Sequence, residues 1–204
     1  MAIIRYDRAA VVRYAYRYVG DPNPQFANMD MQGAGGDCTN FTSQCLLAGG
    51  RPMDYRRTGY DTEWWYRRIG SDPLDAAHND WWSCTWSLPS LLVLYLQLNG
   101  GRGLDLLDRP SRARQLRVGD VVFYDWNGDG LFDHSAVVTR RVNGVPYVTY
   151  RTLAPLRPIR NGHWRLRFRR RARAIRGVLL PNEMETTIST PNWSALRPCE
   201  SGRA

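Results

Sequence analysis

The sequence predicts a single α+β domain, with helices in its first half and an antiparallel sheet in its second half. Apolar residues recur at helical spacing before residue 100, and runs rich in β-branched and aromatic residues follow residue 120. Asn143-Gly144 separates two of these runs, as expected of a two-residue hairpin turn. At 204 residues and 43% hydrophobic content, the chain can bury one sizeable core. We expect the domain to span residues 1–180 and residues 181–204 to form an extended or flexible tail.

Three helices are expected from apolar periodicity and from residues that start or stop a helix. Asp7 caps the first helix, and Gly20 follows its end at about Val19. The second runs from Cys38 to Gly49-Gly50. The third begins near Ser87 and Pro89 and ends near Leu98. The expected strands are 121–124, 136–139, 145–150, 164–168 and 175–180.

The segment between the second and third helices, residues 51–86, is crowded with aromatic side chains but has no clear period. Each ring alone is expected to pack in the core, whereas as a group the rings make a groove near Cys38 plausible. His78, among acidic and amide side chains, is expected at the surface. The aromatic residues are Tyr55, Tyr60, Trp64, Trp65, Tyr66, Trp81, Trp82 and Trp86.

The formal net charge is +9, and all 28 residues in the Lys+Arg count are arginine. Because the arginines are spread along the chain, a solvated surface is the favoured interpretation, and nucleic-acid binding is not expected. Arg169-Arg170-Arg171 is expected to be a solvated turn, with contact to an anionic substrate as the alternative. Neither a signal peptide nor a membrane span is visible, which predicts a cytoplasmic protein without membrane partners.

Four cysteines lack the paired spacing of a structural zinc site and are too few for a disulfide-dense scaffold, so we expect reduced thiols. Cys38 has a distinct setting, because a glycine-rich turn leads into it at a helix start. Unpaired N–H groups there favour thiolate over thiol and can hold an oxyanion. Cys38 is therefore the candidate nucleophile, whereas Cys45, about 10 Å further along the same helix, is expected to be a buried apolar residue.

His134 is the candidate base, because it directly precedes a predicted strand that can hold it. With Asn143-Gly144 as the turn, residue 134 falls opposite residue 153, and Thr149 and Arg151 share its sheet face. A Cys–His pair needs a third polar group to orient the imidazole. Arg151 has no acceptor for a ring N–H, whereas the Thr149 hydroxyl has one.

Two blocks of sequence resemble the bacterial putative amidase domain family, which is similar to papain-like, CHAP-type cysteine peptidases and amidases. The first is Asp37-Cys38-Thr39-Asn40-Phe41 with Ser43-Gln44-Cys45-Leu46, and the second runs from Tyr124 to Ser135 with Val137-Val138-Thr139. The resemblance extends from about Asp7 to Leu180. It implies a papain-like fold with the cysteine at the start of a central helix and the histidine on an antiparallel sheet. Cys38 then matches the nucleophile and His134 the base.

One position departs from the family pattern. Many relatives carry a histidine after the hairpin turn, in an Asn-Ala-His-Thr pattern, where this chain has Thr149-Tyr150-Arg151-Thr152. The third catalytic member therefore stays open. Gln32, six residues before Cys38, stands at the spacing of the oxyanion-hole side chain of papain-like peptidases.

The segment from Asp125 to Asp133 resembles the first part of an EF-hand loop, with oxygen ligands in Asp125, Asn127, Asp129 and Asp133. Ala136 stands where the bidentate glutamate belongs, and strands flank the segment. A tight turn of Asx type that places His134 is the favoured interpretation, and bound calcium is the alternative. No other cofactor is expected.

These observations predict a cysteine amidohydrolase or peptidase that cleaves a peptide or amide bond. Acyl transfer to an amine is a variant of the same chemistry. The alternative of another class is a catalytically silent papain-like module that binds a peptide, a glycan or an acidic partner. The sequence does not identify the substrate or the oligomeric state.

Overall fold

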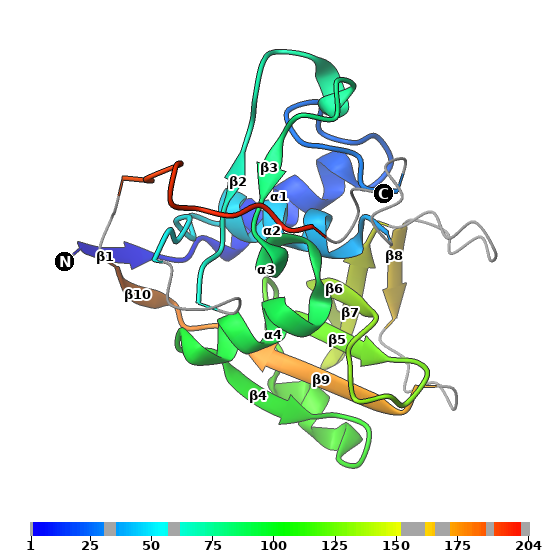
Figure 1. The fold of residues 1–204 in the computed structure, drawn as a ribbon. Helices are drawn as coiled ribbons and strands as arrows, with labels where there is room; N and C mark the ends of the chain where they lie inside the picture. Colours follow the sequence, from blue (N-terminus) through cyan, green and yellow to red (C-terminus); the bar gives the residue numbers. More distant parts are fainter. Residues whose placement is uncertain are drawn as a thin grey trace.

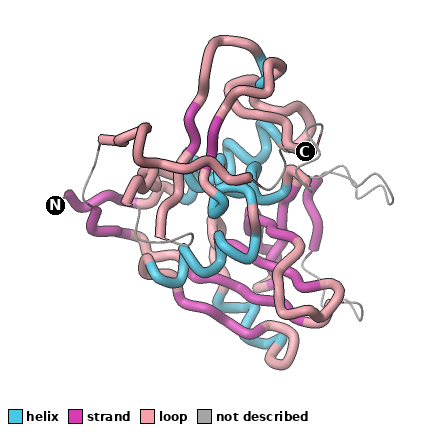
Figure 2. The backbone as a smooth tube through the Cα atoms, in the orientation of Figure 1, coloured by secondary structure: helices cyan, strands magenta, loops and turns pink. Residues whose placement is uncertain are grey.

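The computed structural model describes residues 2–30, 36–56, 62–151, 162–165, 172–186 and 190–200, of which 162–165 are described as backbone only. It is an α+β protein whose described strands all pair antiparallel, as expected from the sequence (Figure 1). The same view coloured by secondary structure shows the helices gathered beside the strands (Figure 2).

The main sheet has six strands in the order β4-β9-β5-β6-β7-β8. Neighbours β5, β6 and β7 follow each other in sequence, whereas β9 comes from the end of the chain and lies between β4 and β5. The sheet strands are β4 (Arg102–Asp105), β5 (Val121–Asp125), β6 (His134–Val142), β7 (Val145–Tyr150), β8 (Gly162–Arg165) and β9 (Ala174–Leu179).

Two smaller pairs accompany this sheet. In the first, the N-terminal β1 (Ala2–Arg5) pairs with β10 (Glu183–Thr186). In the second, β2 (Tyr66–Arg67) pairs with β3 (Trp81–Trp82) in a projecting hairpin (Figure 1).

The helices are α1 (Arg8–Tyr18), α2 (Cys38–Ala48), the short α3 (Cys84–Ser87) and α4 (Pro89–Leu98), with 3-10 turns η1 (Pro73–Asp75) and η2 (Pro110–Gln115). The Asp7 side chain caps α1 by accepting the Ala10 N–H at 2.9 Å, as predicted. Pro89 begins α4, where its fixed backbone angle suits the first helical turn.

Two apolar clusters lie on opposite faces of the main sheet. Phe41 and Leu46 of α2 pack in one cluster with Val121, Phe123 and Val137. The other contains the alternate residues of the same strands together with side chains from the segment around η2: Val122, Tyr124, Ala136, Val138, Leu104, Leu106, Ala113 and Leu116. This alternation follows from the two-residue period of a strand. The helices and their cysteine thus occupy one face of the sheet.

The predicted helices and most predicted strands are confirmed within one or two residues at each end, whereas β6 continues three residues beyond the predicted end of 136–139, to Val142. The fourth predicted strand, 164–168, is described only as far as Arg165, at the end of β8, and Arg169-Arg170-Arg171 lies outside the described residues. Strands β1, β2, β3, β4 and β10 were not predicted from the sequence. They are short. Strands β1, β4 and β10 are defined by partners distant in the chain, and β2 and β3 pair with each other.

The predicted register between β6 and β7 is wrong by one residue toward the open end of the hairpin. Val142 pairs with Val145 as expected at the Asn143-Gly144 turn, but the register shifts between Val138 and Arg140. Beyond this bulge Val137 pairs with Thr149. Thr149 therefore shares a face with Val137 and not with His134, because a one-residue shift exchanges the two faces of a strand.

The segment after residue 180 is attached to the rest of the molecule at several points. Besides β10, the ring of Trp193 lies 5.6 Å from that of Trp65, and the Arg67 guanidinium lies 4.7 Å from its centroid. The segment crosses the β2–β3 hairpin (Figure 1). The expectation of four reduced thiols is wrong for two of them, because Cys84 and Cys199 form a disulfide. Cys38 and Cys45 are free and buried.

Within the described residues, the search for a helix long and apolar enough to cross a membrane found none.

The disulfide should contribute measurably to stability, because it closes a segment of 115 residues and restricts the unfolded chain. Replacing both Cys84 and Cys199 by serine should lower the free energy of unfolding by about 2–5 kcal/mol, measured by urea denaturation. Reductant should shift the wild-type midpoint in the same direction and leave the double variant unchanged. A wild-type midpoint that ignores reductant would contradict the assignment.

Candidate active site

Cys38 is the first residue of α2, as predicted, and its side chain is 6% exposed. Its sulfur lies 3.6 Å from Thr39 Oγ1. Burial raises the pKa of the thiol, while the backbone N–H of Ser135 and the Thr39 hydroxyl act in the opposite direction. The free cysteine is therefore a thiol at neutral pH in the structure as it stands.

Helix α2 is buried on all sides from Cys38 to Leu46, although half of this stretch is polar. Each of these polar side chains makes at least one hydrogen bond, although Gln44 Nε2 is buried without a partner among the described residues. Thr39 Oγ1 and Thr42 Oγ1 lie 3.1 and 3.0 Å from Ser135 Oγ, which joins the helix to β6. Ser43 Oγ donates to the Trp86 carbonyl at 2.9 Å, and Gln44 accepts from the Tyr14 hydroxyl at 2.7 Å.

Asp37, the residue before Cys38, is fully buried and forms an ion pair with Arg151. Arg151 Nε and Nη2 both donate to Asp37 Oδ2, and Nη1 donates to the Tyr18 carbonyl at 3.1 Å. Asp37 Oδ1 accepts from the Met29 N–H at 3.1 Å and from Asn40 Nδ2 at 2.7 Å. Burial raises the pKa of Asp37 to about 6, and Arg151 opposes that rise. This network fixes the turn that carries Cys38.

Asn40 extends the network to the aromatic region. Its side-chain oxygen accepts from Trp86 Nε1 at 2.7 Å, and its Nδ2 also donates to the Ala27 carbonyl at 2.8 Å. The Trp86 ring stacks on Trp64 with centroids 5.0 Å apart. Of the predicted aromatic set, Trp64, Trp65, Tyr66, Trp82 and Trp86 are buried at 5% exposure or less, so they fill the interior and do not wall an open groove. His78 is exposed, as expected.

His134 begins β6, directly before the residue that contacts α2. Its imidazole lies among aromatic rings, 4.6 Å from the Tyr150 centroid and 5.8 Å from that of Tyr124. Burial lowers the pKa of His134 to about 4, so the ring is neutral at physiological pH. Within the described residues, its nitrogens make no hydrogen bond, and none joins the ring to Cys38.

The remaining predicted site residues lie in different parts of the structure. Arg151 lies beside the Cys38 turn through its pair with Asp37. Thr149 Oγ1 lies 2.7 Å from Thr139 Oγ1, inside the sheet. Gln32 lies outside the described residues. The sequence pointed to Cys38 but not to the network that Asp37, Asn40 and Trp86 form around it. The available signal was the set of polar residues in α2, a helix that has core spacing.

The segment from Asp125 to Asp133 is a turn of the Asx type. The Asp125 carboxylate accepts the N–H groups of Gly128 and Gly130 at 2.6 and 3.2 Å, and Asp133 Oδ2 accepts that of Trp126 at 2.7 Å. Asn127 and Asp129 each accept an N–H two residues on, at 3.0 and 2.8 Å. Among the described residues, no three acidic, histidine or cysteine side chains are grouped to hold a metal ion. The turn delivers the chain to His134.

The described geometry therefore offers a thiol at a helix start with the Ser135 N–H beside its sulfur, and a neutral imidazole at the start of β6 that packs against Tyr124 and Tyr150. The thiol and the amide groups of the helix start can support attack of sulfur on a carbonyl carbon and stabilise the resulting oxyanion. The Asp37–Arg151 pair holds the turn that carries the thiol in place.

Two proteins of Bacillus subtilis are similar to this chain. The chain is 34% identical over 149 residues to the uncharacterized protein YhbB of Bacillus subtilis (strain 168), covering 72% of this chain and 42% of that protein. It is 29% identical over 152 residues to the uncharacterized protein YjcM of the same strain, covering 71% of this chain and 30% of that protein. The chain thus spans less than half the length of either relative. No solved structure matches it.

A family assignment comes from the match that spans most of the chain. Residues 5–170 match the putative amidase domain and include both Cys38 and His134. The chain therefore belongs to the putative amidase domain family.

Proposed function

We propose that this protein is a cysteine-dependent amidohydrolase or peptidase of papain-like type, with Cys38 as nucleophile and His134 as base. The observation that carries the proposal is the place of Cys38 in a chain that matches an amidase family: it is the first residue of the buried central helix, with the Ser135 N–H beside its sulfur. Amide groups at a helix start stabilise negative charge that develops nearby.

In the proposed reaction, His134 takes the thiol proton as Cys38 Sγ bonds to the carbonyl carbon of the substrate. The carbonyl electron pair moves to oxygen, where the Cys38 backbone N–H stabilises it. The C–N bond then breaks, and the imidazolium returns the proton to the leaving amine. Water, deprotonated by the same histidine, releases the acyl group and regenerates the thiol.

Both reacting groups are neutral in the unliganded protein, because burial raises the pKa of Cys38 and lowers that of His134. The proposal therefore uses general-base catalysis in place of a standing thiolate–imidazolium pair. It also requires the imidazole to approach the sulfur when substrate binds. The substrate class is a peptide or another amide, and transfer of the acyl group to an amine instead of water is the variant.

A second candidate function is a catalytically silent module of the same fold that binds a peptide, a glycan or an acidic partner. The observation that favours it is Arg151, which is paired with Asp37 beside Cys38 and stands where the family resemblance implies a histidine. A guanidinium cannot accept a ring or thiol proton. Loss of the Cys38 sulfur distinguishes the two candidates, because it removes the nucleophile of an enzyme and removes no catalytic group from a silent module.

Replacing Cys38 by serine should abolish amide cleavage, with a loss of about 10³-fold or more, because a buried hydroxyl is a far weaker nucleophile than a thiol. Release of amine from a panel of peptides and N-acyl amides, measured by mass spectrometry, provides the assay. Circular dichroism should show an unchanged fold. Added amines separate hydrolysis from transfer. Cleavage that survives in the variant would contradict the role of Cys38 as nucleophile, and absence of cleavage by the wild-type chain would favour the silent module.

The pH dependence of Cys38 alkylation tests the state of the thiol. Because its pKa is raised by burial, iodoacetamide should modify Cys38 more slowly in the folded protein than in urea at pH 7, and the rate should rise with pH beyond the range of an ordinary thiol. No step is expected near pH 6.5, because His134 stays neutral there. Peptide mapping after alkylation separates Cys38 from Cys45. A rate that reaches its plateau below pH 7 would instead indicate a standing ion pair.

A further inference from the structure

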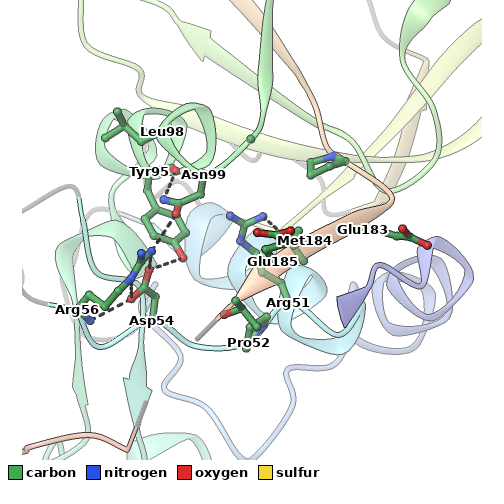
Figure 3. Close-up of a pocket in the computed structure, with 13 residues that line it drawn as sticks. Arg51, Pro52, Asp54, Arg56, Tyr95, Leu98, Asn99, Glu183, Met184 and Glu185 are labelled. Carbon is green, nitrogen blue, oxygen red and sulfur yellow. Dashed lines mark hydrogen bonds and ion pairs between the residues drawn. The ribbon is translucent and has the colours of Figure 1, made fainter. Parts of the chain in front are cut away.

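A pocket of about 450 Å³ lies at the end of α2 opposite to Cys38. It is formed by the segment that follows α2, by the end of α4 and by β10 (Figure 3). The eleven residues of α2 separate it from Cys38 by about 16 Å along the helix axis. It is therefore a separate site from the one described above.

Arg51 is the unusual residue of this pocket. Its side chain is buried, at 3% exposure, and its Nε has no hydrogen-bond partner. Its Nη1 donates to Met184 Sδ at 3.2 Å, and the guanidinium lies 5.2 Å from the centroid of the Tyr95 ring. Burial raises the pKa of Tyr95 to about 12, so this phenol is neutral and supplies no counter-charge.

Two other buried or nearly buried arginines have a carboxylate partner, whereas Arg51 has none among the described residues. Arg151 pairs with Asp37, and Arg8 pairs with Asp120 at 2.8 Å. A buried cation without a counter-ion is costly, because it has lost its hydration without gaining an ion pair. In the part of the chain that the structure describes, the guanidinium of Arg51 therefore has no carboxylate as a counter-ion.

Among the described residues, none of the carboxylates that line the pocket forms an ion pair with Arg51. Asp54 is engaged by Arg56, whose Nε and Nη2 donate to its two oxygens at 2.9 and 2.6 Å (Figure 3). Glu183 is exposed and lies 3.7 Å from Arg5. Glu185 is exposed, and no cationic side chain of the described residues lies within ion-pair distance of it. Counting only partners from the described ranges, the pocket combines the buried cation of Arg51 and the exposed carboxylate of Glu185, each without an ion pair.

We propose that this pocket binds a small zwitterion, a free amino acid or a short peptide, through Arg51 and Glu185. A guanidinium presents parallel N–H donors that match a carboxylate in geometry and charge. Glu185 supplies the complementary charge for an ammonium group and disfavours a ligand that carries two negative charges, such as phosphate. The Tyr95 ring, Met184 and Leu98 provide apolar contact for the atoms between the two charged ends.

Glycylglycine is the test ligand, with acetate, methylamine and inorganic phosphate as comparisons, in isothermal titration and NMR. Binding is measured on the Cys38→Ser chain, so that hydrolysis cannot interfere. Glycylglycine should saturate one site, acetate should bind more weakly, and methylamine and phosphate should bind least. Absence of saturable glycylglycine binding, or equal affinity for phosphate, would overturn the proposal.

Variants assign the binding to this pocket. Arg51→Met should weaken glycylglycine binding at least about thirtyfold, as expected when one partner of a buried charge pair is removed. Glu185→Gln, an exposed change that spares the fold, should weaken it about threefold and leave acetate binding unchanged. Arg13→Gln removes the same charge from a side chain that is 69% exposed and should have no effect. Wild-type affinity in Arg51→Met, or affinity reduced equally by Arg13→Gln, would refute the site.

This test is independent of the amidase proposal, because it reads equilibrium binding in a chain that lacks the nucleophile. A chain that binds glycylglycine but shows no Cys38-dependent cleavage would retain the zwitterion site and lose the proposed enzyme.

Discussion

The buried ion pair between Asp37 and Arg151 is the interaction on which the candidate site depends. It joins the residue before α2 to the residue after β7 and aligns the start of the central helix with the open end of the sheet. The same carboxylate accepts from Met29 and Asn40, so loop, helix and sheet meet at one group. Removing one partner of such a pair leaves an uncompensated buried charge, at a cost of about 3–5 kcal/mol. Burying the two charges has a large desolvation cost, so the pair adds little net stability. Its main effect is to fix the position of the Cys38 thiol.

Local pattern predicted much of this fold, and contacts distant in sequence account for what it missed. Neighbouring residues determine the helix starts at Asp7 and Pro89 and the turn at Asn143-Gly144. The helices and strands that begin or end there were therefore predicted. The bulge between Val138 and Arg140 has no local signal, since no glycine stands between His134 and Val142 to mark it. The predicted register, which lacked this bulge, therefore placed Thr149 on the wrong face of the sheet. The pairing of Cys84 with Cys199 was likewise invisible, because spacing alone does not reveal which cysteines meet.

In the candidate site, too, local sequence predicted some features and contacts distant in the chain determine the others. The helix start at Cys38 was readable, because a glycine-rich turn ahead of an apolar period marks the boundary. The role of Arg151 was not, because the partner of a buried arginine lies 114 residues away along the chain. The setting of His134 also required coordinates: a histidine before a strand carries no signal that its ring will be enclosed by tyrosine and tryptophan and lose its basicity. The local sequence thus predicted where Cys38 and His134 lie in the fold, and the tertiary contacts determine their protonation.

The place of β9 in the sheet has a consequence for where this folding unit ends. The match to the putative amidase domain stops at residue 170, but Ala174–Leu179 forms an interior strand between β4 and β5, and Cys199 is covalently joined to the start of α3. A protein cut at the family boundary would expose the ladder edges of two strands at once and leave Cys84 as a lone thiol. The unit that folds is therefore longer than the unit that is recognisable by sequence. Any transfer of this domain into another protein has to carry the residues through Cys199 with it.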